Sequence, residues 1–210
     1  MTELRFTLLT DGPSDASLIS PLTWLLQTNG VRHALNPQWA DLSHLPQRPR
    51  GLRERIKTAL SYYPCELLFV HRDAERERRE TRVAEILGAI KDLAVPPLIC
   101  VVPVRMTEAW FLFDEAAIRR AAGNPNGKEA LGLPNLSRHE DEPDPKQVLR
   151  FALLAATGMS LRRQRGFPVT ERVRRLAELI DDFSSLRSLA AFCQLEKDLK
   201  AIIRVQNWRS

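Results

Sequence analysis

The segment Leu67-Leu-Phe-Val-His-Arg-Asp-Ala-Glu75 passes from four large apolar residues directly into three potential metal ligands, His71, Asp73 and Glu75. An unbroken apolar run of this length predicts a strand covered on both faces, as in the middle of a parallel sheet. In such sheets, ligands bind beyond the carboxyl ends of the strands. If the chain stays extended past Val70, the side chains at positions 71, 73 and 75 point the same way. This spacing suits a shared divalent cation.

Strand and helix patterns alternate around this segment. Residues 4–10 and 96–103 are predicted as strands, and residues 31–40 as a weaker one. Pro21 either kinks the first helix or opens a second helix that Ser20 caps. The order predicts an α/β fold with a mostly parallel four-stranded sheet flanked by helices and joined by right-handed crossovers. The predicted helices cover residues 16–28, 51–62, 75–93 and 106–122.

The pattern divides the chain into three parts. Residues 1–123 carry the strand–helix alternation and predict the α/β core. Residues 124–146 are rich in Gly, Pro, Asn and acidic side chains, which predicts a long loop. Residues 147–210 have helical patterns only, and we expect them to form a C-terminal helical extension packed on the core.

The composition is that of an ordinary globular protein. The 210 residues are 44% hydrophobic and 27% charged, and no apolar run approaches the roughly 18 residues of a membrane span. The first residues lack the pattern of a secretory signal peptide, so we expect a cytoplasmic protein with no membrane contact. The three cysteines, Cys65, Cys100 and Cys193, are far apart, which argues against a disulfide framework and a zinc clip.

A second acidic position follows the first predicted strand. Asp11 would project into the same crevice as Asp73, and Gly12 would let the chain turn and a ligand approach. The alternative is an ordinary Asp-Gly turn before a helix, with Ser14 or Asp15 as the helix cap.

The cluster after the central strand also has an ordinary explanation. Asp73 can cap a helix and Glu75 can be a favourable acid in its first turn, but this leaves His71 unexplained. As ligands, carboxylate oxygens favour Mg²⁺ or Mn²⁺, and the imidazole favours Mn²⁺.

A third acid, Glu108, follows the last predicted strand, with Thr107 as a possible helix cap. Its neighbours are mostly apolar, so the Glu108 carboxylate would be partly desolvated. It would then need a cation, which either Arg105 or a metal ion could provide.

Basic residues indicate how nucleic acid could be held. The net charge of +5 gives mild attraction to phosphate, so the placement of the charges matters more than their sum. Arg162, Arg163 and Arg165 lack neighbouring acids and are the better phosphate-binding candidates, whereas residues 72–82 mix both signs like a solvated helix face. No Gly-rich phosphate loop and no Gly-x-Ser-x-Gly elbow is present, which argues against a nucleotide phosphotransferase and a serine hydrolase.

Together, the acid-Gly turn after the first strand, the acid cluster after a central strand and the strand–helix alternation resemble the Toprim fold of topoisomerases, primases and overcoming-lysogenization-defect nucleases. The similarity covers residues 4–122. It is closest to a Toprim-like family of uncharacterised bacterial proteins in which this core precedes a helical tail. In Toprim enzymes, a Glu after the first strand and an Asp-x-Asp pair after the central strand hold magnesium and assist phosphoryl transfer.

Carried over to this sequence, the resemblance places Asp11 at the Glu position and His71 and Asp73 at the two Asp positions. Glu75 lies just beyond, and Glu108 is a candidate for an additional ligand. Asp11 is one methylene shorter than Glu and His71 replaces an acid, so magnesium binding should be weaker. Preference for manganese, use of a shifted acid, or loss of catalysis would each follow from this difference.

The resemblance thus implies a nuclease that depends on Mg²⁺ or Mn²⁺ and acts on DNA or RNA, for example in defence against phage or mobile elements. Its catalytic residues would be Asp11, Asp73 and Glu108. The alternative is a catalytically degenerate nucleic-acid-binding protein or defence-complex subunit, with a protein partner or as a homodimer. In either case the expected metal ligands are Asp73, His71, Glu75 and Asp11, and the expected nucleic-acid contacts are Arg105, Arg162, Arg163 and Arg165.

Overall fold

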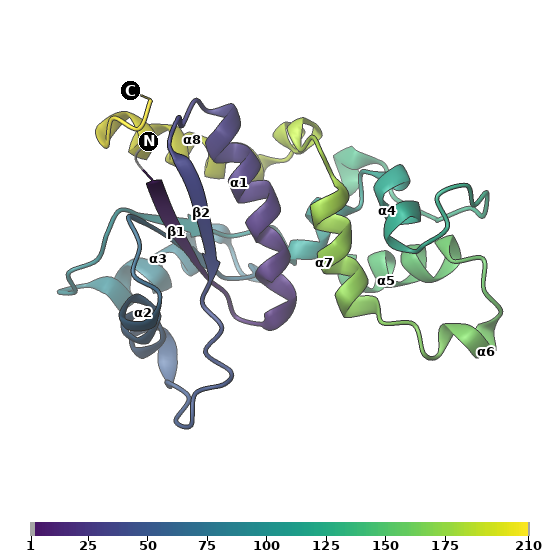
Figure 1. Cartoon of the computed structure of the whole chain (residues 1–210), viewed down its shortest axis with the longest axis horizontal. Coiled ribbons are helices and arrows are strands. Elements are labelled where there is room, and N and C mark those ends of the chain that lie inside the picture. The colour runs from purple at the N-terminus through teal and green to yellow at the C-terminus, as the bar shows by residue number, and fades with distance from the viewer. Residues whose placement is uncertain (1–2, 210) are drawn as a thin grey trace.

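The computed structural model describes residues 3–209 and contains a four-stranded sheet whose neighbouring strands are all parallel (Figure 1). The strand order is β2-β1-β3-β4. The predicted α/β fold with a parallel four-stranded sheet is confirmed. The strands are β1 (Glu3–Leu9), β2 (Ala34–Trp39), β3 (Leu67–His71) and β4 (Leu98–Val101).

Helices cover both faces of this sheet (Figure 1). Helices α2 and α3 pack on one face, and α1 and α8 lie on the other. No membrane-spanning segment is found among the helices of the described residues. The α-helices are α1 (Ile19–Thr28), α2 (Gly51–Tyr62), α3 (Arg79–Ile90), α4 (Glu115–Ala121), α5 (Pro145–Ala156), α6 (Leu161–Gln164), α7 (Val169–Leu179) and α8 (Ala190–Val205). Short 3₁₀ helices are η1 (Pro13–Leu18), η2 (Thr107–Phe111), η3 (Leu136–Arg138) and η4 (Ser184–Ser188).

The side chains of β3 alternate between the two apolar layers. Leu67 and Phe69 belong to the layer that contains α1 and α8, whereas Leu68 and Val70 belong to the layer of α2 and α3. All four are fully buried, and burial of each stabilises the fold by about 1.5–3 kcal/mol. Because the alternation has a period of two, the next residue, His71, is directed to the α1 side of the sheet.

The last helix returns to the sheet. Phe192 of α8 packs edge-to-face against Trp110 of η2, with ring centroids 5.2 Å apart, and also contacts Trp24 of α1. The Glu140 carboxylate, from the segment predicted as a long loop, accepts hydrogen bonds from two backbone N–H groups at the start of α8. The loop is therefore tied to α8, and α8 is part of the layer that covers the sheet.

Two helices differ from their sequence patterns. The helix expected from residue 75 begins only at Arg79, because Glu75 adopts a left-handed conformation (φ 55°) and its N–H donates to the Arg105 carbonyl at 2.9 Å. The single helix expected over residues 106–122 is split into η2 and α4. Its break lies at Asp114, whose carboxylate accepts the Ala117 N–H at 2.8 Å and caps α4.

Neither predicted role of Pro21 is found. The chain first forms the 3₁₀ helix η1, and Pro21 is the third residue of α1. Backbone N–H groups in the first turn of a helix have no partner within that helix, so proline removes no hydrogen bond there. Pro21 therefore lies within α1 without breaking its ladder of hydrogen bonds.

Candidate metal centre

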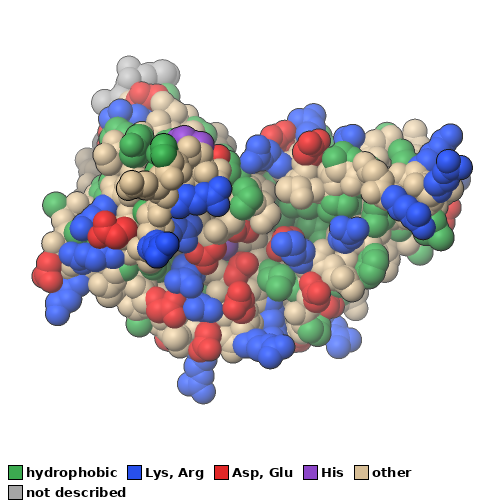
Figure 2. All heavy atoms as spheres, turned by 90° about the horizontal axis from the view of Figure 1, so that it is seen from below, with side chains coloured by type: hydrophobic (Ala, Val, Ile, Leu, Met, Phe, Trp, Pro, Cys, Tyr) green, Lys and Arg blue, Asp and Glu red, His purple; other side chains and the backbone are tan. Residues whose placement is uncertain are grey.

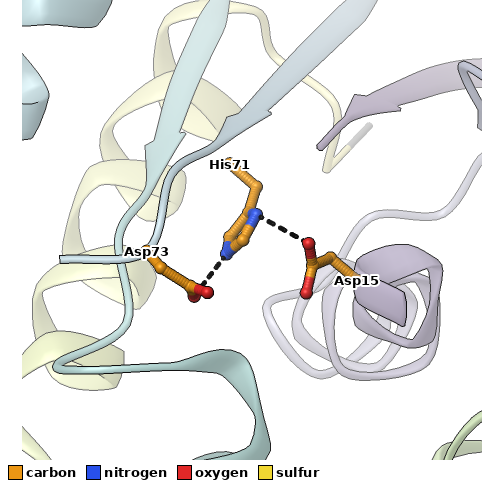
Figure 3. A group of neighbouring side chains, drawn as sticks. All are labelled: Asp15, His71 and Asp73. Atoms are coloured by element: carbon orange, nitrogen blue, oxygen red, sulfur yellow. Dashed lines mark hydrogen bonds and ion pairs between the residues drawn. The ribbon is translucent and has the colours of Figure 1, made fainter. Parts of the chain in front are cut away.

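Three potential metal ligands meet at the edge of the sheet where the strands end, which we call the carboxyl edge. His71 is the last residue of β3, Asp73 follows it, and Asp15 lies in η1 after β1. One ligand atom from each side chain lies within 4.8 Å of the other two, and His71 stands between the carboxylates (Figure 3). This arrangement defines the candidate metal centre.

The His71 imidazole is 1% exposed and contacts both carboxylates. Its Nε2 lies 3.1 Å from Asp73 Oδ1, within hydrogen-bonding distance, whereas its Nδ1 lies 3.7 Å from Asp15 Oδ2. Nδ1 is therefore buried without a hydrogen-bond partner among residues 3–209. Burial opposes the charged imidazole, but the hydrogen bond to Asp73 and the negative charges of Asp15 and Asp73 outweigh it and raise the pKa of His71.

The 3₁₀ helix η2, which follows β4, contributes the residue that holds Asp73 in place. Thr107, the first residue of η2, is 1% exposed. Its backbone N–H donates to Asp73 Oδ1 at 3.1 Å, and its hydroxyl lies 3.0 Å from His71 Nε2 and 3.4 Å from Asp73 Oδ1. From the sequence, Thr107 was expected only as a helix cap, because its contact with Asp73 spans 34 residues.

Asp15 was expected only as a possible helix cap, and the structure adds a second role. Its carboxylate accepts the Gly12 N–H at 3.1 Å, which is a capping contact, and also faces His71. The side chain is almost fully buried. Burial raises the pKa of Asp15, and the nearby charge of Asp73 adds to this, while His71 acts in the opposite direction. A buried carboxylate of this kind is stabilised when a cation lies beside it.

Asp11 lies outside the candidate metal centre. Its two carboxylate oxygens pair with Arg55 at 3.0 Å and with Arg72 at 2.8 Å. The first acid after β1 is thus neutralised by arginines, and the second acid, Asp15, occupies the crevice expected for Asp11. Gly12 has extended dihedral angles (φ −137°, ψ 167°), so the turn does not require glycine for its backbone conformation.

Glu75 also lies outside the group. Its side chain is 65% exposed and its nearest recorded partner is Arg82, at 3.5 Å. The left-handed backbone at Glu75 ends the extended alternation that would have placed residues 71, 73 and 75 on one side.

The Glu108 carboxyl group, in contrast, interacts electrostatically with two members of the candidate metal centre, Asp73 and Asp15. It is 6% exposed. Burial raises its pKa, and the charges of Asp73 and Asp15 raise it further, while Lys146 acts in the opposite direction. A buried carboxyl group with a raised pKa is suited to proton transfer.

The predicted nucleic-acid contacts fall into two places. Arg105 and Arg82 line a hollow of about 430 Å³ whose lining also includes Glu75, Glu77 and Asp144. The Arg82 Nε donates to the Asp73 carbonyl. Arg162 and Arg163 in α6, with Arg165 directly after it, are exposed at the far end of the helical part (Figure 1). They do not join the candidate metal centre. Figure 2 looks onto the carboxyl edge and shows basic and acidic side chains interleaved across its middle.

Comparisons with known proteins gave no relative. No protein-family model matches the sequence, and no curated protein and no solved structure matches it. The parallel α/β architecture is consistent with a Toprim-like fold. The resemblance to Toprim enzymes therefore depends on the residue pattern and on this architecture.

Proposed function

We propose that the protein is a divalent-metal-dependent phosphoryl-transfer enzyme that cleaves phosphodiester bonds in nucleic acid. The observation that supports this most directly is the convergence of Asp15, His71 and Asp73 within 4.8 Å at the carboxyl edge. Open parallel sheets bind ligands at this edge. Two carboxylates balance the charge of a divalent cation, and the imidazole favours Mn²⁺ over Mg²⁺.

The buried Nδ1 of His71 supports the fit to a metal ion. A buried polar atom without a partner is unfavourable, and a cation between His71 and Asp15 would satisfy both side chains. When bound, such a cation supplies positive charge beside the scissile phosphate and lowers the pKa of a water molecule. Asp15, His71 and Asp73 would be its ligands.

Other residues would position these ligands and move protons. Thr107 fixes the orientation of Asp73 through its backbone N–H and its hydroxyl group, as outer hydrogen-bond partners do at metal sites. Glu108 is the candidate general base or acid, because burial and the neighbouring carboxylates raise its pKa. Arg105 lines the same hollow as Arg82 and can hold a phosphate group, whereas the Arg82 guanidinium is already paired with Glu85 at 3.0 Å.

A second candidate is a nucleic-acid-binding protein without catalysis. It is favoured by the fact that a protonated His71 would lie between the two carboxylates and attract both, which would make the cluster a largely buried ion triad without a metal ion. It is also favoured by Asp11, which is fully paired with arginines. The two candidates differ in whether the cluster takes up a metal ion.

Calorimetric titration with Mn²⁺ and Mg²⁺, together with a DNA- and RNA-cleavage assay, tests the proposal. We expect the unsubstituted protein to bind Mn²⁺ and to cleave in its presence. Asp73→Ala should lose both properties. Asp11→Asn is the matched control at the same edge and should keep Mn²⁺ binding, because Asp11 lies outside the cluster. Cleavage by pure Asp73→Ala, or no Mn²⁺ uptake by the unsubstituted protein, would reject the proposal.

A further inference from the structure

A second feature of the carboxyl edge has no role in the metal chemistry. A hollow of about 250 Å³ lies at the ends of β1 and β2 and is lined by residues 10–13, residues 39–43, Arg48, Pro49 and Arg55. We call it the Trp39 pocket. It is next to the candidate metal centre along the edge, because β1 lies between β2 and β3. The two places share one turn: Gly12 lines the pocket, and its N–H holds the Asp15 carboxylate at 3.1 Å.

The wall of this pocket contains a fixed aromatic ring. Trp39 ends β2, and its Nε1 donates to the Thr10 hydroxyl at 3.0 Å. The Arg174 guanidinium of α7 lies over the indole, 5.6 Å from its ring centroid. Arg174 and Trp39 line a separate hollow, and Arg174 does not line the Trp39 pocket. The indole is therefore already held by Thr10 in the pocket wall and by Arg174 outside the pocket, so a ligand would not have to order it.

The pocket also has one arginine whose side chain makes no hydrogen bond among the described residues. Arg55 is engaged by Asp11 and by the Thr10 carbonyl. Arg48 is exposed, and its guanidinium makes no hydrogen bond or ion pair within the part of the chain that the structure describes. Of the acids in the lining, Asp11 is paired with Arg55 and Arg72. Asp41 accepts the Ser43 N–H at 2.9 Å, and its charge also attracts Arg48 without a direct ion pair. Arg48 is thus the group that remains for a phosphate.

We propose that the Trp39 pocket binds one unpaired nucleotide of a single-stranded nucleic acid, with its base on Trp39 and its phosphate at Arg48. The inference rests on the proposed function and names its substrate class. A base within a duplex has both faces stacked and cannot lie against an indole, whereas an unpaired base can. The pocket is smaller than the 300–1,000 Å³ typical of whole-ligand sites, so it suits one unit of a longer chain.

This arrangement sets the path of a bound nucleic-acid strand along the carboxyl edge of the sheet. A nucleotide in the Trp39 pocket lies against the turn that positions Asp15, so the next phosphodiester of the same strand is carried toward Asp15 and Asp73. The pocket would then select unpaired segments and deliver them to the candidate metal centre.

Fluorescence anisotropy of a labelled single-stranded oligonucleotide, measured with EDTA present, tests the inference without any metal chemistry. We expect Trp39→Ala to weaken binding about tenfold or more and Trp39→Phe, which keeps an aromatic face, to weaken it much less. Arg48→Ala should reduce the dependence of log K on log salt by about one unit. The matched controls are Tyr62→Ala and Arg204→Ala, two exposed residues away from the carboxyl edge, and they should bind normally.

Three results would overturn the inference: no binding of the single strand by the unsubstituted protein, unchanged binding by Trp39→Ala, or equal affinity for a perfect duplex or a free mononucleotide. Thermal unfolding of Trp39→Phe and Arg48→Ala shows whether those variants are folded. The metal proposal fails separately. Strand binding that depends on Trp39 in a protein that takes up no Mn²⁺ would support the pocket and reject the enzyme, and Asp73→Ala should bind the strand normally in EDTA.

Discussion

His71 Nδ1 lies 3.7 Å from Asp15 Oδ2, just beyond hydrogen-bonding distance, although both side chains are buried. The other ring nitrogen of His71 contacts Asp73 at 3.1 Å. One imidazole thus joins the end of β1 to the end of β3. Either a proton on the imidazole or a bound divalent cation can stabilise these two contacts. Only the divalent cation would enable the cluster to take part in catalysis.

Glu108→Gln should make the metal-free protein more stable at alkaline pH while abolishing proton transfer. Because burial raises the pKa of Glu108, the unfolded chain loses this proton first, and stability falls as the pH rises above the ordinary Glu range. Glutamine removes the charge but keeps the shape. We expect a gain on the order of 1 kcal/mol in the free energy of unfolding at pH 8, measured by urea denaturation with EDTA.

At pH 4 the Glu108→Gln variant and the unsubstituted protein should have nearly the same free energy of unfolding. Glu171→Gln is the exposed control and should change neither measurement. A variant that is less stable than the unsubstituted protein at pH 8 would show that the Glu108 carboxylate is stabilised by its surroundings.

Thr107→Val should weaken Mn²⁺ binding without removing a ligand. Valine has a similar shape but lacks the hydroxyl that lies 3.0 Å from His71 Nε2. Loss of an outer hydrogen-bond partner typically lowers metal affinity by about 10–100-fold. We also expect a loss of about 1–2 kcal/mol in stability, because a buried group loses a hydrogen bond.

Calorimetry with Mn²⁺ measures the first effect of Thr107→Val, and urea denaturation measures the second. Thr28→Val is the control, because the Thr28 hydroxyl bonds only to its own helix, at the Trp24 and Leu25 carbonyls. Unchanged Mn²⁺ affinity in Thr107→Val would mean that Thr107 does not position the ligands.

Glu196→Gln should destabilise the protein at neutral pH and have little effect in strong acid. The Glu196 carboxylate is 5% exposed and is bound by Arg187 at 2.7 Å, Lys200 at 3.3 Å and the Asn29 amide at 3.1 Å. The hydrogen bonds from Arg187 lower the pKa of Glu196 to about 2, against the opposing effect of burial. The unfolded carboxyl has its ordinary pKa near 4.5.

Because the folded pKa is the lower one, the stabilisation by Glu196 is complete above pH 4.5 and is lost as the pH falls toward 2. We expect a difference of about 1–3 kcal/mol between the two proteins at pH 7, shrinking with acid, in urea denaturation at several pH values. Glu178→Gln removes a half-exposed pair with Arg175 and should cost less than about 1 kcal/mol. An effect of Glu196→Gln that does not depend on pH would contradict this account.

The sheet could be predicted from the sequence because the patterns that determine it lie within short segments of the chain. The apolar run that ends at Val70 requires cover on both faces, and strand–helix alternation then leaves few arrangements other than a parallel sheet. The position of His71 at the end of β3, with Asp73 next to it, follows from the same run. These two members of the candidate metal centre were therefore predicted as neighbours.

The third member could not be chosen from local pattern. Asp11 and Asp15 both follow β1, and the choice between them depends on Arg55 and Arg72, which lie 44 and 61 residues away from Asp11. Likewise, Glu75 turns away because its N–H bonds to the Arg105 carbonyl. In the sequence, Asp15 could be recognised as an alternative to Asp11 only because it is a second acid, four residues further along, in the same turn.

The return of α8 to the sheet has a consequence for how the chain can fold. Phe192 covers Trp110 and contacts Trp24, and the Trp208 carbonyl accepts the Arg32 N–H just before β2. A nascent chain that has emerged only as far as η2 would leave Trp24 and Trp110 without the Phe192 side chain that packs against them. Until α8 has left the ribosome, the apolar layer that it completes stays open, and early intermediates would expose hydrophobic surface that a chaperone can bind.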